Sequence, residues 1–297
     1  MTEVDLFQTH RPALFAVAYR MLGSATEAED VLQDAWLRFS SAQPSGLRSI
    51  KAYLTTIVTR LCLDRLKSAR ATREEYVGTW LPEPVATDDR TEPEGSLALT
   101  ESVTLAFIVL LETLSPEERA VFLLREVFDY EYDEIGGMLD TTPANCRQLF
   151  HRARGRIAER KPRFRATMEE KRPLVERFVR AFSEGSEAEL TSVLAEDVGF
   201  WSDGGGKAAA ARRPIFGREQ VVKLLVGIRR AAPATGVPLE SVTLDIAEVN
   251  GELALVLRVA GRLDGIYVMT VEHDAIAAIR VVRNPDKLTY IGRQLAH

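Results

Sequence analysis

The chain has 297 residues, of which 46% are hydrophobic, and a formal net charge of −5. This length allows about two or three domains with sizeable cores. The charge argues against indiscriminate binding of nucleic acid, and no apolar run approaches the ~18 residues of a membrane span. The N-terminus carries Glu3 and Asp5 where a secretory signal would be basic and then apolar, so a cytoplasmic protein is expected.

Basic and acidic blocks alternate along the first 172 residues. Residues 45–73 hold seven basic side chains against one acidic, 112–140 hold nine acidic against two basic, and 147–172 hold ten basic against three acidic. This alternation predicts contact with a polyanion at two separated places and with something basic elsewhere. A solvated charged face is the alternative for each block.

Up to about residue 165, apolar residues recur at spacings of three and four, which predicts an all-helical N-terminal half. Two capping boxes are expected within it, Thr26 with Glu29 and Ser115 with Glu118. Cys62 and Cys146 stand alone in this helical part, without the paired spacing of a zinc site or a redox dithiol, so we expect both to be buried as small apolar residues. No metal or other cofactor is expected.

A helix-turn-helix is predicted in YDEIGGMLDTTPANCRQLFHRARGRI, with a short helix over Tyr132–Leu139 and a second helix capped by Thr142 and beginning at Pro143. The apolar side chains of the second helix fall on one face. Its other face carries Asn145, Arg147, Gln148, His151, Arg152, Arg154 and Arg156. This arrangement suits a recognition helix that reads base edges and phosphates, and an ordinary amphipathic surface helix is the alternative.

The pattern changes beyond about residue 166. Amphipathic helices are predicted over 174–182 and 187–194, followed by alternating β-branched runs. The Asn250-Gly251 step between two such runs predicts a hairpin. We therefore expect four parts: residues 1–77 and 105–165 as all-α domains, 78–104 as a proline-rich linker, and 166–297 as an α+β domain around an antiparallel sheet.

Three stretches carry a family resemblance: RPALFAVAYRMLGSATEAEDVLQDAWLRF, SIKAYLTTIVTRLCLDRLKSAR and LSPEERAVFLLREVFDYEYDEIGGMLDTTPANCRQLFHRARGRI. They resemble regions two and four of bacterial sigma factors of the extracytoplasmic-function group. The C-terminal part resembles the SnoaL-like extension of one subgroup, a cone with a curved antiparallel sheet, in which WLPEPV, DGGGK and NPDKL recur. The resemblance implies a transcription initiation factor whose own C-terminal domain modulates it, with no separate anti-sigma factor.

The same resemblance implies binding residues. The β′ clamp helices of core RNA polymerase would contact Asp30, Gln33, Asp34 and Trp36, although a Trp at this helical spacing is equally expected in a core. The promoter near the start site, including the melted non-template strand, would contact Arg48, Ser49, Lys51, Arg60, Arg65 and Lys67. Duplex DNA further upstream would contact Asn145, Arg147, Gln148, Arg152, Arg154 and Arg156. The family typically has Lys-Ser where this chain has Arg147-Gln148, so the promoter sequence is not implied.

The stretch Asp203, Gly204, Gly205, Gly206 and Lys207 looks like a phosphate loop, but Ala208 replaces the Ser or Thr that would bind magnesium. By the resemblance it is a flexible contact loop, with Asp203 and Lys207 pairing with charges on a helical domain. A second joint is implied at Asn284, Pro285, Asp286 and Lys287.

An alternative from another class is a DNA-binding regulator whose SnoaL-like domain binds or converts a small molecule. Candidate acids and bases for such chemistry are Asp203, Asp245, Asp264 and His273, although strand alternation could place all four in solvent. We assign no catalytic residue and do not expect an enzyme. A two-component response regulator would need a βα receiver domain, whereas residues 1–75 are predicted to be helical.

Overall fold

The computed structural model describes residues 2–42, 49–74, 76–87, 104–158, 168–231 and 238–296. By internal contacts the chain divides into two compact units, Met1–Glu75 with Asp89–Lys161, and Tyr76–Asp88 with Pro162–His297. This division differs from the expected boundaries, because residues 76–87 associate with the C-terminal unit. No helix in the described ranges is long and apolar enough to cross a bilayer.

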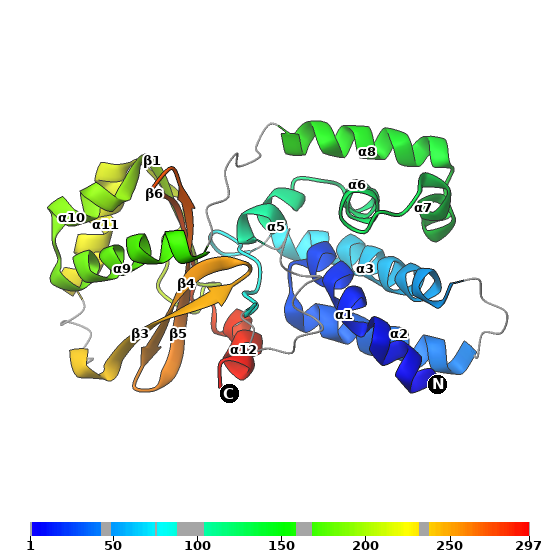
Figure 1. Cartoon of the computed structure of the whole chain (residues 1–297), viewed down its shortest axis with the longest axis horizontal. Coiled ribbons are helices and arrows are strands. Elements are labelled where there is room, and N and C mark those ends of the chain that lie inside the picture. Colours follow the sequence, from blue (N-terminus) through cyan, green and yellow to red (C-terminus); the bar gives the residue numbers. More distant parts are fainter. Residues whose placement is uncertain are drawn as a thin grey trace. The chain divides into compact units, whose positions relative to one another are not determined.

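The first three helices form a bundle: α1 (Glu3–Leu22), α2 (Ala25–Ala42) and α3 (Ile50–Glu74) (Figure 1). Helix α1 ends at Gly23 in the left-handed conformation, which turns the chain sharply into α2. The cap of α2 is Ser24, whose Oγ accepts a hydrogen bond from the backbone N–H of Glu27, rather than the predicted Thr26. Cys62 is buried as expected, and burial raises the pKa of its thiol.

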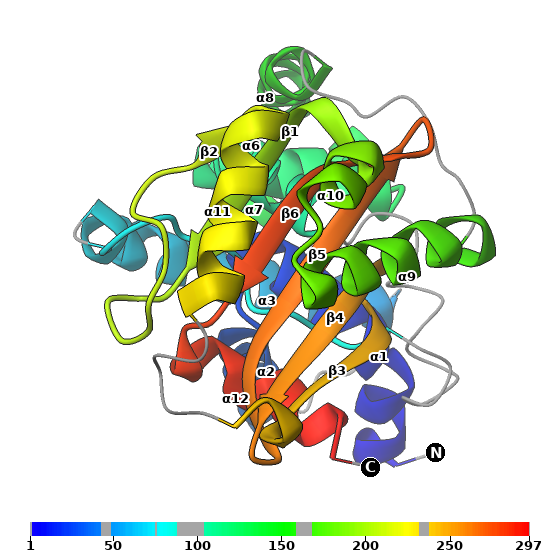
Figure 2. The same ribbon diagram turned by 90° about the vertical axis from the view of Figure 1, so that its left-hand side faces the viewer.

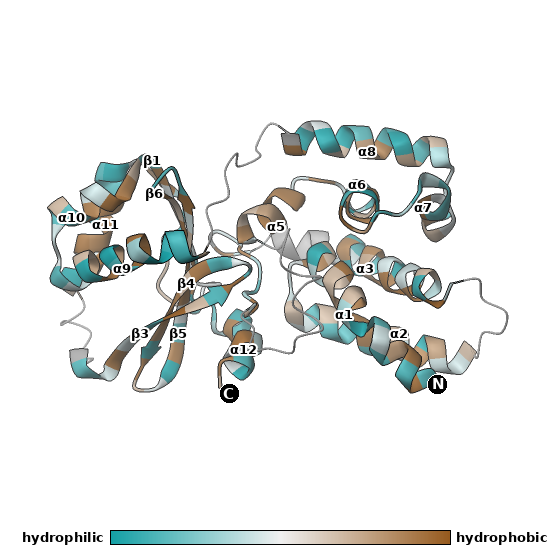
Figure 3. Ribbon diagram, viewed as in Figure 1, coloured by the Kyte–Doolittle hydropathy of each residue, from teal (hydrophilic) through white to brown (hydrophobic). Residues whose placement is uncertain are grey.

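The second helical segment of this unit comprises α5 (Leu105–Leu111), α6 (Pro116–Phe122), a π-helical turn η1 (Leu123–Val127), α7 (Tyr132–Leu139) and α8 (Pro143–Ala158). The capping box of Ser115 with Glu118 is confirmed at the start of α6. Figure 3 shows α8 as largely hydrophilic, with apolar residues at intervals. One of these is Cys146, which is fully buried as predicted.

The second unit is an α+β domain, as predicted. Its elements are α9 (Met168–Glu184), α10 (Glu187–Val193), β1 (Leu194–Asp203), β2 (Ile215–Phe216), α11 (Arg218–Ala231), a short 3-10 turn η3 (Leu239–Ser241), β3 (Val242–Val249), β4 (Glu252–Val259), β5 (Arg262–Glu272), β6 (Ala275–Val282) and α12 (Pro285–Gln294). The sheet order is β2-β1-β6-β5-β4-β3. The Asn250-Gly251 hairpin is confirmed between β3 and β4, but β1 pairs with β6 in parallel, so the sheet is not wholly antiparallel.

Helices α9, α10 and α11 lie across one face of this sheet (Figure 2). The apolar residues of the strands that point to this face, such as Phe200, Met269 and Ile279, pack with Val175 and Val221 of the helices into one core. Because paired strand residues share a face and alternate residues switch faces, Trp201, Arg280 and Asp203 point to the opposite side.

Candidate functional site

The predicted helix-turn-helix is present, and α7 has the predicted bounds. Helix α7 ends at Asp140 in the left-handed conformation, and the hydroxyl of Thr142 accepts a hydrogen bond from the Asn145 N–H at 3.2 Å to cap α8. The turn brings the backbone oxygen of Thr141 so close to Gly136 that a Cβ on this residue would lie 2.8 Å from it. The turn therefore requires glycine at position 136.

Two neighbouring glycines of α7 give a matched pair of substitutions. Gly136→Ala is expected to destabilise the helix-turn-helix, because the added methyl group would overlap the Thr141 carbonyl. Gly137→Ala meets nothing within 4 Å and is expected to stabilise α7 by up to about 1 kcal/mol. Thermal unfolding of the two variants measures the difference. Equal melting temperatures would show that the close turn is not needed.

The exposed face of α8 presents four of the six predicted DNA-binding side chains, namely Arg147, Gln148, Arg152 and Arg154. The guanidinium of Arg147 lies 5.7 Å from the ring centroid of Tyr132. The other two make contacts within the unit. Asn145 donates its side-chain amide to the Thr141 hydroxyl at 3.0 Å, and Arg156 pairs at 2.6 Å with the buried Glu118 of α6.

Three of the four predicted polymerase-binding residues, Asp30, Gln33 and Trp36, line a groove of about 450 Å³ between α1 and α2. Asp30 and Gln33 are exposed there, and the Trp36 ring packs edge-on against Phe7 at 5.3 Å while remaining partly exposed. Asp34 is not among the groove residues that the structure shows. Its carboxylate pairs with Arg65 of α3 at 3.0 Å.

The predicted start-site residues lie along α3, except Arg48, which is outside the described residues. Ser49 caps the helix by accepting a hydrogen bond from the Ala52 N–H. Arg65 is bound within the bundle, by Asp34 and by the backbone oxygen of Glu27 at 3.0 Å. Lys67 lies 3.6 Å from Glu117 of α6. Lys51 and Arg60 contact the second helical segment.

A buried polar cluster in the C-terminal unit joins β1, α12 and the segment after α3. We call Tyr76, Leu81, Asp203, Asn284 and Lys287 the linker hub. At its centre the fully buried carboxylate of Asp203 accepts four hydrogen bonds, from the Tyr76 hydroxyl at 2.6 Å, the Lys287 ammonium at 2.7 Å, the Leu81 N–H at 2.8 Å and the Gly205 N–H at 3.0 Å.

Lys287 is the cation of the hub. Its ammonium also donates to the backbone oxygen of Leu81 and lies 4.7 Å and 4.5 Å from the ring centroids of Tyr76 and Trp80. Such ring faces attract a desolvated cation. The Asn284 amide donates to the Tyr76 hydroxyl at 2.9 Å. Burial, together with the hydrogen bond to Asp203, raises the pKa of Tyr76, so the hydroxyl remains a donor at neutral pH.

The glycine loop after Asp203 is a tight turn rather than a phosphate cradle. The N–H groups of Lys207 and Ala208 both donate to the Gly204 oxygen, and a Cβ on Gly204 would lie 2.2 Å from the Ala208 oxygen. The N–H groups of Gly205, Lys207 and Ala208 are therefore already bonded within this loop. The sequence predicts partners on a helical domain for Asp203 and Lys207, but Asp203 instead binds the hub and Lys207 pairs with Asp286. The DGGGK and NPDKL segments thus meet each other.

The last residues of the segment, 85–87, contact the end of β3 and the turn that follows it. Val85 and Asn250 are joined by two hydrogen bonds. The Asn250 N–H donates to the Val85 backbone oxygen at 2.9 Å, and the Val85 N–H donates to the Asn250 side-chain oxygen at 3.0 Å. Ala86 forms a bridge with Val249, and the Thr87 N–H donates to Glu248. The end of the segment is therefore held at the edge strand β3 by one isolated antiparallel bridge and the hydrogen bonds around it.

Comparison with known proteins explains this architecture. The Sigma-70 region 2 model matches residues 6–72 and the Sigma-70 region 4 model matches residues 104–157. The ECF RNA polymerase sigma factor SigJ of Mycobacterium tuberculosis is 35% identical, over 97% of this chain and 93% of SigJ. The chain belongs to the extracytoplasmic-function sigma factors. Such sigma factors bind core RNA polymerase and promoter DNA.

The likeness of this sigma factor to its relatives extends over all its domains. The probable ECF RNA polymerase sigma factor SigI of the same species is 30% identical over 97% of this chain and 96% of SigI. The crystal structure of M. tuberculosis SigJ matches with a TM-score of 0.77 and 34% identity, covering 97% of this chain and 99% of that one. Helices α1–α3 thus form region 2, and α5–α8 form region 4.

The four acid and base candidates of the enzyme alternative do not meet in this sigma factor. Asp203 is in the linker hub, Asp245 pairs with Arg258, Asp264 pairs with Arg283, and His273 is exposed in the turn between β5 and β6. The sheet face under α9, α10 and α11 is occupied by the apolar core.

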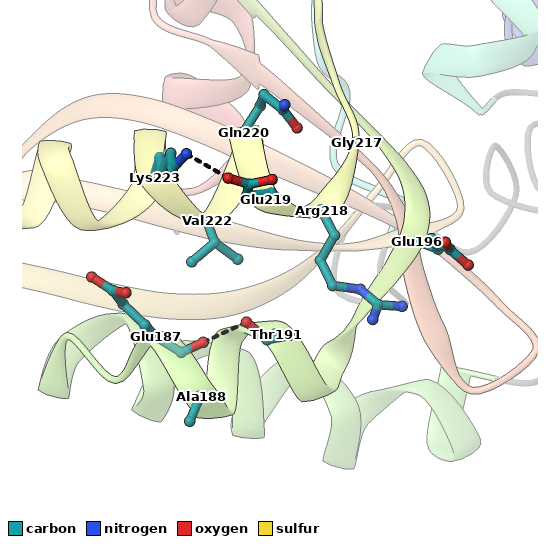
Figure 4. A pocket seen from close by; sticks show the side chains of 10 residues that line it. All are labelled: Glu187, Ala188, Thr191, Glu196, Gly217, Arg218, Glu219, Gln220, Val222 and Lys223. Atoms are coloured by element: carbon teal, nitrogen blue, oxygen red, sulfur yellow. Dashed lines mark hydrogen bonds and ion pairs between the residues drawn. The ribbon is translucent and has the colours of Figure 1, made fainter.

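A cavity of about 800 Å³ lies elsewhere, between α10, the start of β1 and the first turns of α11 (Figure 4). Lys223 pairs with Glu219, and Glu187 pairs with Arg230.

Sequence reasoning missed the role of residues 76–87, which it assigned partly to the first domain and partly to a linker. One signal was available. The acidic, proline-rich stretch contains four apolar residues, Val77, Trp80, Leu81 and Val85. Apolar side chains are uncommon in a fully solvated linker, because they gain nothing there from burial. Leu81 and Val85 are each only 1% exposed.

Proposed function

We propose that this sigma factor directs core RNA polymerase to specific promoters through the exposed faces of α8 and of the α1–α2 groove, and that its C-terminal domain controls this step through the linker hub. The hub carries the proposal. Residues 76–87 connect region 2 to region 4 in the sequence, so a domain that binds them acts on the connection between the two promoter-binding regions.

For upstream promoter recognition, we propose that Arg147 and Gln148 contact bases and that Arg152 and Arg154 contact phosphates. A guanidinium can donate two hydrogen bonds to guanine, and a glutamine amide can pair with adenine. All four side chains lie on the exposed face of α8. Asn145 and Arg156 support the geometry of this helix instead, since both have partners within region 4.

For polymerase binding, we propose that Asp30, Gln33 and Trp36 form the contact surface. Two exposed polar groups beside a partly exposed indole suit a basic, amphipathic partner such as the β′ clamp helices. Asp34 acts indirectly, because its ion pair with Arg65 fixes α2 against α3.

The Asp30→Lys variant is expected to bind core RNA polymerase at least about tenfold more weakly, because like charges at an interface repel. Binding is measured by competition with the unmodified chain for sigma-free core polymerase. Glu176→Lys is the control, because Glu176 is exposed on α9 of the C-terminal domain. Equal losses in the two variants would mean that the groove is not the contact surface.

We propose that the control by the C-terminal domain needs no separate anti-sigma factor, since the hub and the segment it binds belong to one chain. The protein would act in the cytoplasm with its polymerase and would catalyse no reaction of its own. The alternative of a small-molecule regulator is not favoured, because the candidate acids and bases are dispersed.

The direct test of initiation is run-off transcription with the purified chain, sigma-free bacterial core RNA polymerase and DNA from upstream of its own coding region. RNA with one defined 5′ end that depends on the chain supports the proposal. A chain that neither binds core polymerase nor yields RNA from any bacterial promoter template would contradict it.

A further inference from the structure

Two arginines of region 4 contact one aromatic ring. The ring belongs to Tyr132, the first residue of α7, and its centroid lies 5.7 Å from the guanidinium carbon of Arg147 in α8 and 5.2 Å from that of Arg125 in η1. Both distances fall within the ~6 Å over which the face of a ring attracts a cation. The ring thus joins the two helices of the helix-turn-helix through Arg147.

The Tyr132 ring is itself held in place by its neighbours. It meets the Phe150 ring of α8 edge-to-face, with centroids 6.0 Å apart and ring planes at 65–75°, namely 71°. Phe150 stacks in turn on Phe122 of α6, also at 6.0 Å. Tyr132 further packs against the buried region 4 cluster that contains Ile135. Because these contacts fix the ring, it offers the exposed Arg147 side chain a fixed surface.

The two arginines differ in their other partners. Arg125 donates from Nη1 to the Tyr130 backbone oxygen at 3.0 Å and pairs with Glu131 at 2.9 Å. Arg147 has no hydrogen-bond or ion-pair partner among the described residues. A ring face orients a guanidinium without supplying an oxygen acceptor, so the five N–H donors of Arg147 remain available to another molecule.

An exposed arginine loses rotamer freedom when it binds a ligand, and this loss weakens binding. A side chain that already rests on a fixed ring has less freedom to lose. We propose that Tyr132 is a positioning residue for promoter recognition, whose ring holds the Arg147 guanidinium ready to bind a base edge. This inference rests on the proposed function for the role of Arg147, but the contact between ring and guanidinium can be tested without DNA.

Two substitutions separate the ring from the rest of the side chain. Tyr132→Phe keeps the ring, and Tyr132→Leu keeps an apolar side chain against the cluster but removes the ring. Base preference is measured by letting the holoenzyme select duplexes from a pool randomised in the upstream promoter element. In Tyr132→Leu we expect the preference at the position read by Arg147 to fall by about two- to fivefold, as for an exposed cation–π contact. Tyr132→Phe should keep it.

A merely structural role of Tyr132 predicts a different result, because damage to the helix-turn-helix would weaken binding of all sequences alike. We expect the salt dependence of binding to stay unchanged in Tyr132→Leu, since Arg152 and Arg154 still contact phosphates in the proposed complex. In a chain that already carries Arg147→Ala, Tyr132→Leu should alter base preference no further. An equal loss with and without Arg147 would overturn the inference.

The contact itself is measured by NMR on the free full chain labelled with ¹⁵N-arginine. The Arg147 Nε–H resonance, assigned by its absence in Arg147→Ala, should move in Tyr132→Leu and stay near its position in Tyr132→Phe, because an aromatic ring shifts the resonances of nearby protons. An unmoved resonance in Tyr132→Leu would overturn the inference.

The outcomes also separate this inference from the proposed function. If Arg147→Ala loses base preference and Tyr132→Leu keeps it, the positioning role alone is wrong. If Arg147→Ala keeps the base preference of the unmodified chain, the proposed base contact of Arg147 is wrong and the positioning role is overturned with it.

Discussion

Replacing Lys287 with methionine is expected to lower the free energy of unfolding of the C-terminal domain by about 3–5 kcal/mol. Methionine keeps most of the side-chain volume, but the Asp203 carboxylate remains fully buried without its cation. The hydrogen bonds from Tyr76, Leu81 and Gly205 do not neutralise that charge. Hydrogen exchange of the amides in β1 and α12 measures the loss as a lower free energy of opening.

The same domain supplies a matched control, since Lys207 and Asp286 form a second lysine–aspartate pair. These side chains are 55% and 64% exposed, whereas those of Lys287 and Asp203 are 10% and 0% exposed. Lys207→Met is therefore expected to cost less than about 1 kcal/mol. Similar losses in the two variants would show that Asp203 is not held as a buried charge.

Replacing Arg147 with alanine is expected to lower transcription from the cognate promoter by about 10–100-fold while leaving polymerase association intact. The reason is the loss of a guanidinium from the face of α8 that we propose contacts bases, where one bidentate contact is worth about 1–3 kcal/mol. Run-off transcription measures promoter output, and competition for core polymerase measures association.

Arg152→Ala is the comparison for that experiment, because a phosphate contact should weaken binding of all sequences and reduce its salt dependence. Arg147→Ala should instead lose discrimination at particular base pairs. Loss of polymerase association in Arg147→Ala would show that the role assigned to α8 is misplaced.

Local signals in the sequence predicted the helix-turn-helix well. A hydroxyl at Thr142, a proline at position 143 and the apolar spacing of α8 all act within a few residues, and the structure has α7 and the start of α8 where they were expected. The same local signals predicted the wrong N-cap for α2, where two residues that can cap a helix lie close together. Ser24 and Thr26 both suit a helix cap, and the chain uses Ser24.

The linker hub could not be predicted in this way because its partners are distant in the sequence. Tyr76 and Asp203 are 127 positions apart, and Leu81 and Lys287 are 206 apart. The prolines at positions 82 and 84 favour an extended segment, but they do not predict which residues of the chain bind that segment. Likewise, the parallel pairing of β1 with β6 depends on a crossover that no local pattern specifies.

The central claim is that the hub controls initiation through the linker, and Tyr76→Phe tests it most directly. This variant removes one hydrogen bond to Asp203 and the acceptor of the Asn284 amide, but keeps the ring beside Lys287. We expect faster hydrogen exchange in residues 76–87 and about 3–10-fold more run-off RNA than from the unmodified chain, with Lys207→Met unchanged. Faster exchange without any change in RNA would contradict the claim.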